Sequence, residues 1–194
     1  MDLRSGRPNL MHIQVYRSNA ELPDHLRGQI LSLIRIEWPD DAGDYLGPEA
    51  LPETWHPSHV VGTQGDAILS YAGVVWRHIE HAGEILKTYG LSSVFTFPAM
   101  RRRGLGSRIV RHATSWIRQA GDGDVALLFT APGMESFYER CGWQAMHATQ
   151  FLIGDRAAPR VHDAVAMMLF LSAKGRQHQS AFADARVYVG VDPW

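Results

Sequence analysis

A glycine loop between a long strand and an amphipathic helix constrains this chain more than any other feature. Residues 84–97 are typical of a β-strand, and Pro98 ends it because proline has no N–H for a sheet. Residues 101–106 (RRRGLG) follow, and apolar residues then recur at helical spacing as far as Ala120. A helix N-terminus behind a strand and a glycine loop is a typical phosphate site, because unpaired N–H groups point outward there.

Three known motifs compete for this loop, and two of them fail. A P-loop requires a lysine followed by serine or threonine, and no such pair follows Gly106. A dinucleotide fingerprint requires a third glycine where this chain has Ile109. The pattern [QR]-x-x-G-x-[GA] directly after a strand fits residues 101–106. By themselves these six residues are equally typical of an arginine-rich loop that only solvates a helix start, but the strand before and the helix after them favour an anion site.

The other periodic segments predict a single mixed α/β domain over residues 12–194, behind a flexible N-terminus of residues 1–11. Further strands are expected at residues 12–17, 60–63, 67–78, 125–130 and 165–171, and from residue 143 onward. Helices are expected at residues 22–38, 104–120 and 134–141. Residues 38–57 contain four prolines and two glycines, and they predict a long loop of the kind that is often functional.

Charge and composition argue against several classes of function. The net charge of -1 gives no reason to expect nucleic acid or a membrane surface as a partner. The single cysteine, Cys141, excludes an intrachain disulfide, and no apolar run approaches the ~18 residues of a membrane span. The first ten residues lack the apolar stretch of a signal peptide, which predicts a cytoplasmic protein. No metal site is expected, because the cluster of His78, Glu80 and His81 is more typical of a solvated turn and the His-x-x-His spacing is not specific.

The order of these segments resembles the GNAT superfamily of acyl-CoA-dependent N-acyltransferases. The resemblance covers residues 12–194 and is strongest over residues 94–143, where RRRGLG, a buried strand and SFYERCGW follow one another. It implies a central, mostly antiparallel sheet of about seven strands, splayed between its central strands and flanked by about four helices. It also implies that acetyl-CoA is the acyl donor.

The same resemblance assigns the acetyl-CoA site to two neighbouring segments. The pyrophosphate would lie on the backbone of the glycine loop, and pantetheine would pair with the exposed edge of the strand before it. The N–H of Val94 would bind the thioester carbonyl. The implied residues are Val94, Phe95 and Thr96 in the strand and Arg101, Arg102, Arg103, Gly104, Leu105, Gly106 and Ser107 in the loop.

A closer likeness is to aminoglycoside 2'-N-acetyltransferases, through residues 74–106, the segments GDY, ETWH and SFYERCGW, and a chain that ends on tryptophan. In those enzymes a glutamate on the central strand is proposed to act through water as general base, and Ser92 stands at the matching position. Ser92 is therefore expected to orient a water. Tyr138 is expected to protonate the departing thiolate, the alternative being a buried aromatic with a satisfied hydroxyl.

The acceptor is predicted to be an amine. Residues 37–53 contain six acids and no lysine or arginine, which would attract a polycation, although such a stretch is also typical of a solvated loop. Asp44, Asp163 and the terminal carboxylate of Trp194 are the expected acceptor-binding groups. The predicted reaction is direct attack on acetyl-CoA by a primary amine of an aminoglycoside-like molecule in a ternary complex. The alternatives are a peptide or polyamine acceptor and a non-catalytic acyl-CoA sensor, and a homodimer is the expected assembly.

Overall fold

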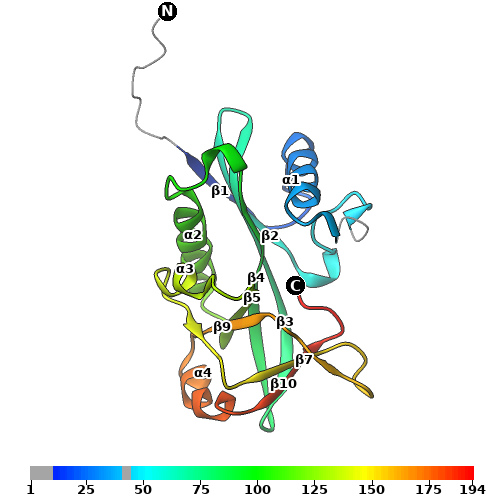
Figure 1. Cartoon of the computed structure of the whole chain (residues 1–194), viewed down its shortest axis with the longest axis vertical. Helices are drawn as coiled ribbons and strands as arrows, with labels where there is room; N and C mark the ends of the chain where they lie inside the picture. Colours follow the sequence, from blue (N-terminus) through cyan, green and yellow to red (C-terminus); the bar gives the residue numbers. More distant parts are fainter. Residues whose placement is uncertain (1–10, 41–44) are drawn as a thin grey trace, which may run out of the picture.

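The structure, a computed structural model, describes residues 11–40 and 45–194 and is built around a seven-stranded mixed sheet (Figure 1). Residues 1–10 and 41–44 lie outside the described residues, and with them most of the predicted N-terminal segment and Asp44. In chain order the elements are β1 (His12–Tyr16), α1 (Asp24–Glu37), β2 (Ser58–Gln64), β3 (Ala67–His81), β4 (Glu84–Thr96), α2 (Leu105–Ala120), β5 (Val125–Thr130), α3 (Glu135–Glu139), β6 (Gln144–Ala145), β7 (Gln150–Ile153), β8 (Arg160–Val161), β9 (Val165–Phe170), α4 (Ala173–Gln177) and β10 (Arg186–Gly190).

The seven strands follow the order β1-β2-β3-β4-β5-β9-β6, and all neighbours are antiparallel except β4 and β5. These two parallel strands pair at three positions only, the last of which joins Gly90 to Leu127. Beyond this pair β4 continues to Thr96 and β5 to Thr130 without pairing to each other, so the sheet opens between its central strands. The predicted mixed α/β fold, with its splayed sheet and flanking helices, is thereby confirmed.

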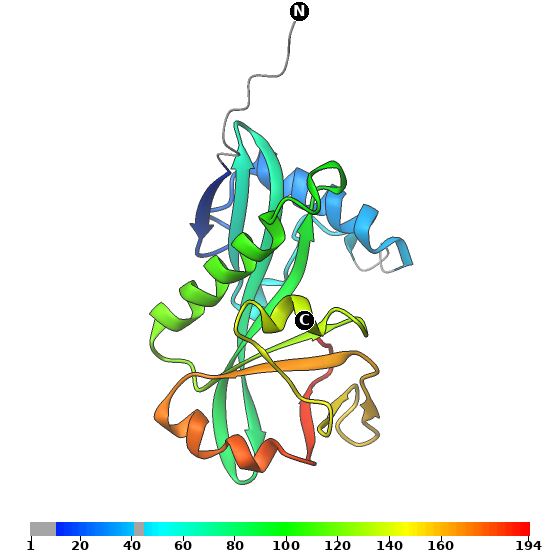
Figure 2. The same cartoon turned by 60° about the vertical axis from the view of Figure 1, so that its left-hand side comes forward.

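Helices cover the two faces of the sheet differently. On one face α2 buries an apolar stripe that includes Ile109, Ala113 and Ile117, and α3 lies at the open end of the same face (Figure 2). On the other face α1 packs against the β2–β4 region through Ile30 and Ile34. The alternation of side chains along the strands gives each face its own apolar core, as expected for a sheet covered on both sides.

The chain also forms a second sheet, which the sequence did not predict, in the order β10-β7-β8. It packs on the α1 face below the opening, where Phe151 and Val187 join an apolar cluster with Val125 and Leu127. The prediction of one strand from residue 143 onward was wrong in extent, because β6 has only two residues and the chain then crosses to the second sheet. No helix in the described part of the chain is long and apolar enough to span a membrane.

Candidate active site

A β-bulge lies next to the opening between β4 and β5. Tyr71 pairs with Phe95 and Gly73 pairs with Ser92, so Ala72 faces two residues of β4 instead of one. Ser93, the first of these two, has a φ of 49°, which is unusual for a residue with a side chain. A bulge of this kind re-aims the backbone of its strand. Here it turns the end of β4, beginning with Val94, toward the gap left by β5.

A cleft of about 700 Å³ occupies this gap on the α2 side. All of the predicted acetyl-CoA residues except Arg103 line it. The remaining lining residues come from α1, α3 and the turns beside α3: Glu37, Met134, Phe137, Tyr138 and Arg140. The structure therefore brings the strand edge, the glycine loop and the predicted catalytic tyrosine to one cavity, while the exposed Arg103 lies outside its lining.

Two glycines shape the phosphate end of the cleft. Gly104, the N-cap of α2, has a φ of 78°, which only glycine adopts without strain. A Cβ at Gly106 would lie 3.2 Å from Oγ1 of Thr96 and 3.4 Å from Cζ of Phe137, so a hydrogen is needed there for α2 to approach both neighbours. No side chain caps the N-terminus of α2. Its first N–H groups are consequently open to an anion in the cleft.

Arg101 bridges the mouth of the cleft. Its Nη2 forms an ion pair with Glu37 at the end of α1, and its Nε donates to the carbonyl of Thr96 over 3.1 Å. Arg101 therefore occupies a carbonyl on the same strand edge that the family resemblance assigns to pantetheine.

Tyr138 lies on the α2 side of the opening. It is only 8 % exposed, and its ring meets that of Phe137 edge to face, with the ring centres 4.8 Å apart. Burial raises the pKa of Tyr138 to about 12, while a hydrogen bond with Thr130 acts in the opposite direction. The hydroxyl is therefore fully protonated near neutral pH and can act as a donor.

Ser92 lies on the other face of β4, which is the α1 face. It is 5 % exposed, and its Oγ is 3.2 Å from Oγ of Ser93. Gly73 stands opposite Ser92 in the sheet, and a Cβ there would come within 2.6 Å of Cδ1 of Leu51. Leu51 therefore packs closely over this row of the sheet and belongs to the long loop that precedes β2.

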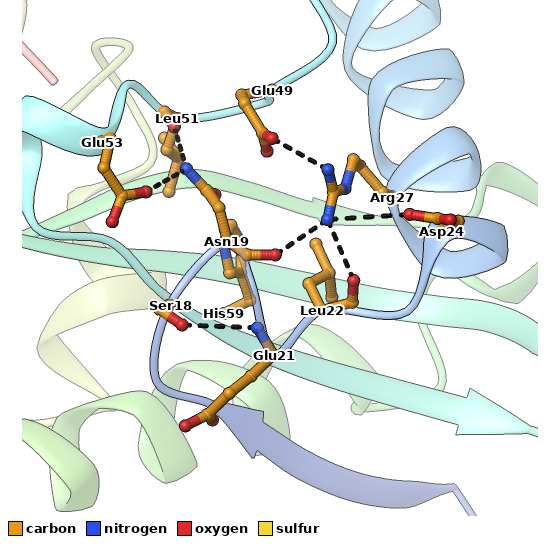
Figure 3. A network of polar contacts seen from close by, with 10 residues as sticks. All are labelled: Ser18, Asn19, Glu21, Leu22, Asp24, Arg27, Glu49, Leu51, Glu53 and His59. Atoms are coloured by element: carbon orange, nitrogen blue, oxygen red, sulfur yellow. Dashed lines mark hydrogen bonds and ion pairs between the residues drawn. The ribbon is translucent and has the colours of Figure 1, made fainter.

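A buried polar network holds that loop against the sheet (Figure 3). Nδ2 of Asn19 donates to the carbonyl of Leu51 over 3.1 Å and to Oε2 of Glu53 over 2.8 Å. Arg27 donates to Oε1 of Glu49 over 2.8 Å and to the carbonyl of Asn19, also over 2.8 Å. Two acids of the acidic stretch, Glu49 and Glu53, are thus bonded to side chains of the protein, and a third, Glu37, pairs with Arg101.

His59 links this network to Tyr71 on β3. Its two ring nitrogens lie 2.8 Å from the hydroxyl of Tyr71 and 2.9 Å from Oδ1 of Asn19. Because the amide nitrogen of Asn19 is already committed as a donor, Nε2 of His59 must donate to Oδ1 and Nδ1 must accept from Tyr71. Burial, followed by the charge of Arg27, lowers the pKa of His59 to about 4, so the ring is neutral and acts as a structural bridge.

Trp194 reaches the point where β4 and β5 part, on the α1 face. A Cβ at Gly90 would lie 2.1 Å from Nε1 of Trp194, and this nitrogen is 3.4 Å from the carbonyl of Leu127. The guanidinium of Arg77 lies 4.2 Å from the centre of the Trp194 ring and 5.7 Å from that of Trp55. The indole of Trp194 therefore lies beside the opening.

Of the other predicted acceptor groups, Asp163 is exposed and stands two residues before β9, and Asp44 lies outside the described residues. Sequence reasoning did not single out His162, next to Asp163. Its ring meets that of Phe129 edge to face at 4.5 Å. No local pattern marks this histidine, because Phe129 belongs to a different strand.

Comparison with known proteins decides the family. The profile of the acetyltransferase (GNAT) domain matches residues 47–146, more than half of the chain. The chain belongs to the GNAT acetyltransferase family. The predicted superfamily and the prediction of an acetyl-CoA-dependent acyltransferase are thereby confirmed. A search of curated protein sequences finds no match.

Solved structures share the fold of this GNAT protein at low identity. Escherichia coli ElaA is 15 % identical with a TM-score of 0.59, over 82 % of this chain and 99 % of that one. The E. coli GNAT N-acetyltransferase YhbS, solved with CoA, is 14 % identical with a TM-score of 0.58, over 94 % and 92 %. Aminoglycoside 6'-acetyltransferase type Ii is 18 % identical with a TM-score of 0.55, over 84 % and 98 %. Identities this low show a common fold and leave the acceptor open.

Proposed function

We propose that this GNAT protein transfers an acetyl group from acetyl-CoA to a primary amine of a small, polycationic, aminoglycoside-like acceptor. The observation that carries the proposal is the cleft between the splayed strands, where an uncapped helix N-terminus, a strand edge and a protonated tyrosine meet. The amine attacks directly while both substrates are bound, so the protein supplies proximity and orientation as well as acid–base groups.

Acetyl-CoA would enter from the α2 side. Its pyrophosphate would accept hydrogen bonds from the backbone of residues 104–107, with Arg101 and Arg102 adding charge. Pantetheine would pair with Val94 to Thr96, which requires Arg101 to release the carbonyl of Thr96. The YhbS structure, which has the same fold and was solved in complex with CoA, supports CoA as the ligand.

The chemistry would take place at the bulge. The amine nitrogen bonds to the thioester carbon, the carbonyl oxygen becomes an oxyanion held by the N–H of Val94, and the C–S bond then breaks. Tyr138 gives its proton to the departing sulfur, since its hydroxyl is protonated and lines the same cleft. Ser92, on the opposite face of β4, would orient a water or the amine.

The acceptor would bind on the α1 face, where Trp194, Trp55 and the loop before β2 meet around Arg77. Asp163, Asp44 and the carboxylate of Trp194 would receive its ammonium groups. Glu49 and Glu53 already have hydrogen-bond partners within the protein (Figure 3). Fewer acids of residues 37–53 are therefore left to attract a polycation than the composition implied.

The test is turnover. The protein is incubated with acetyl-CoA and a panel of aminoglycosides, polyamines and amino-terminal peptides, and release of free thiol is followed. We expect turnover with small molecules that carry several amines, and the highest kcat/KM within that class. Best turnover with peptides or simple polyamines would overturn the acceptor assignment. Tight CoA binding without turnover of any amine would overturn the reaction itself and identify an acyl-CoA sensor.

A further inference from the structure

The segment that leads into β9 runs past the end of β5, which borders the opening of the sheet. Thr130, the last residue of β5, pairs with Val165, the first residue of β9, and Phe129 pairs with Ala166. Residues 162–164 therefore pass the carboxyl end of β5, which is the end from which β4 has separated. Any side chain that this segment directs to the α1 face stands beside the reacting centre.

His162 is directed to that face. Phe129 belongs to the apolar cluster of the α1 face that also contains Trp194, whereas its neighbour Leu128 belongs to the core under α2. The ring of His162 packs edge to face on Phe129, at 4.5 Å and 76°. His162 therefore lies on the same side of the sheet as Ser92 and Trp194.

The strand register places His162 at the level of the reaction. Ser92 is two residues beyond Gly90 on β4, and Phe129 is two residues beyond Leu127 on β5. Each is therefore about 6.6 Å past the last pair of the two strands. Ser92 and Phe129 therefore stand at matching heights on the two strands that border the gap, and His162 packs on Phe129. Tyr138 lies on the opposite, α2 side of the same gap.

We propose that His162 is the general base that takes the proton of the acceptor amine, on the opposite side of the acetyl group from Tyr138. This inference rests on the proposed acetyl transfer and assigns to it the base that Ser92 cannot supply. As the amine nitrogen bonds to the carbonyl carbon, a ring nitrogen of His162 takes one N–H proton. The C–S bond breaks, the sulfur takes the proton of Tyr138, and both side chains regain their starting protonation from solvent.

The surroundings of His162 suit this role. Within the described residues neither ring nitrogen has a hydrogen-bond partner, while its backbone N–H donates to the carbonyl of Phe151 over 2.8 Å. His59, by contrast, is fully buried with both nitrogens engaged. On this face His162 can therefore bond a substrate through its ring, whereas His59 cannot.

The charge state of His162 fits as well. Partial burial, followed by the charge of Arg160, lowers its pKa below 6.5, and Asp163 opposes them. Phe129, which packs on the ring from β5, carries no charge, and Arg160 and Asp163 are the charged groups that act on His162. The ring is therefore neutral at pH 7 and above. Activity should fall as the pH drops through this lowered pKa, because the protonated ring cannot accept a proton.

The decisive variant is His162→Ala, measured as kcat/KM for the best amine across pH 5 to 9. We expect a loss of about 100-fold at neutral pH, the lower end of what a general base contributes. Affinity for CoA and the KM for acetyl-CoA should not change. The acidic fall in the wild-type profile should disappear, and added imidazole should restore part of the rate. His112→Ala, on the exposed face of α2, is the matched control and should behave as wild type.

The outcomes separate this inference from the proposed function. An active wild type with an unchanged His162→Ala overturns the inference alone. A His162→Ala variant that loses activity but keeps the acidic fall and is not restored by imidazole also overturns it, because the histidine is then structural. His162→Gln, which preserves size, should lose activity like the alanine variant if folding is intact by CoA affinity. A wild type that turns over no amine overturns the proposed function and this inference with it.

Discussion

The two sides of the open sheet are built by different means. The acetyl-CoA side comes almost entirely from residues 94–107 and 134–140, close together in the chain, and it offers backbone groups at a strand edge and a helix start. The proposed acceptor side draws on five separate segments, through Trp55, Arg77, Phe129, His162 and Trp194. A site made of backbone groups depends little on which side chains the sequence supplies, whereas a site made of side chains depends on each of them.

This contrast predicts that single substitutions act on one side at a time. Changes on the α2 side should alter CoA affinity or the chemical step and leave the acceptor KM unchanged. Changes on the α1 face should alter the acceptor KM or the deprotonation of the amine and leave CoA affinity unchanged.

The largest effect is expected from Tyr138→Phe. Loss of the proton donor to the thiolate should lower kcat by about 100-fold, with CoA affinity unchanged because the ring and its packing remain. Since the pKa of Tyr138 is raised to about 12, wild-type activity should show no fall from its deprotonation below about pH 11. Steady-state thiol release measures both. Tyr89→Phe, whose hydroxyl donates to Asp122 outside the cleft, is the control, and equal rates for the two variants would remove Tyr138 from the mechanism.

A smaller effect, confined to the acetyl-CoA side, is expected from Gly106→Ala. The added methyl would press on Thr96 and Phe137 and push the start of α2 away from β4. Crowding of this kind costs about 1–3 kcal/mol, so CoA should bind about 5- to 150-fold more weakly. Calorimetric titration with CoA measures the change. Gly28→Ala, which has open space around its Cβ, should bind CoA as wild type does, and a raised acceptor KM in Gly106→Ala would contradict the separation of the two sides.

The corresponding substitution on the proposed acceptor side is Gly90→Ala. Here the methyl would occupy the place of the Trp194 indole, so this ring must leave the gap and lose its contact with Arg77. A cation–π contact of this kind is worth about 0.5–1 kcal/mol, which predicts an acceptor KM up to about fivefold higher. CoA affinity should stay at the wild-type value. An unchanged acceptor KM would show that Trp194 does not contribute to acceptor binding.

The contrast between a side built from nearby residues and one built from distant residues also explains which elements could be predicted from the sequence. The glycine loop, the strand before it and Tyr138 were predicted because strand alternation, the proline and the helical stripe are local patterns, and the family resemblance added their roles. The long strand β4 and the helix α2 were found for the same reason.

Long-range contacts account for what was missed. β7 and β10 are short strands that pair in parallel, Gln150 with Arg186, so neither has a distinctive local pattern. The bulge at Ser93 requires a positive φ that serine does not favour, and only the pairing of β3 with β4 imposes it. His162 is placed near the opening only by its contact with Phe129, which is distant in the sequence. Three acids of residues 37–53 are already paired with Arg27, Asn19 and Arg101, which the sequence alone does not show.

The smallest expected effect tests whether the acetyl-CoA side is held closed by its own charges. In Glu37→Gln the ion pair with Arg101 is lost, and the arginine is free to meet the phosphates. Exposed ion pairs contribute about 0.2–1 kcal/mol, so CoA should bind up to about fivefold more tightly at low ionic strength. The gain should vanish in 1 M salt, where charges are screened within about 3 Å. Glu135→Gln, an acid at the start of α3, controls for the loss of one negative charge near the cleft. Weaker CoA binding in Glu37→Gln would show instead that the pair positions Arg101 for its ligand.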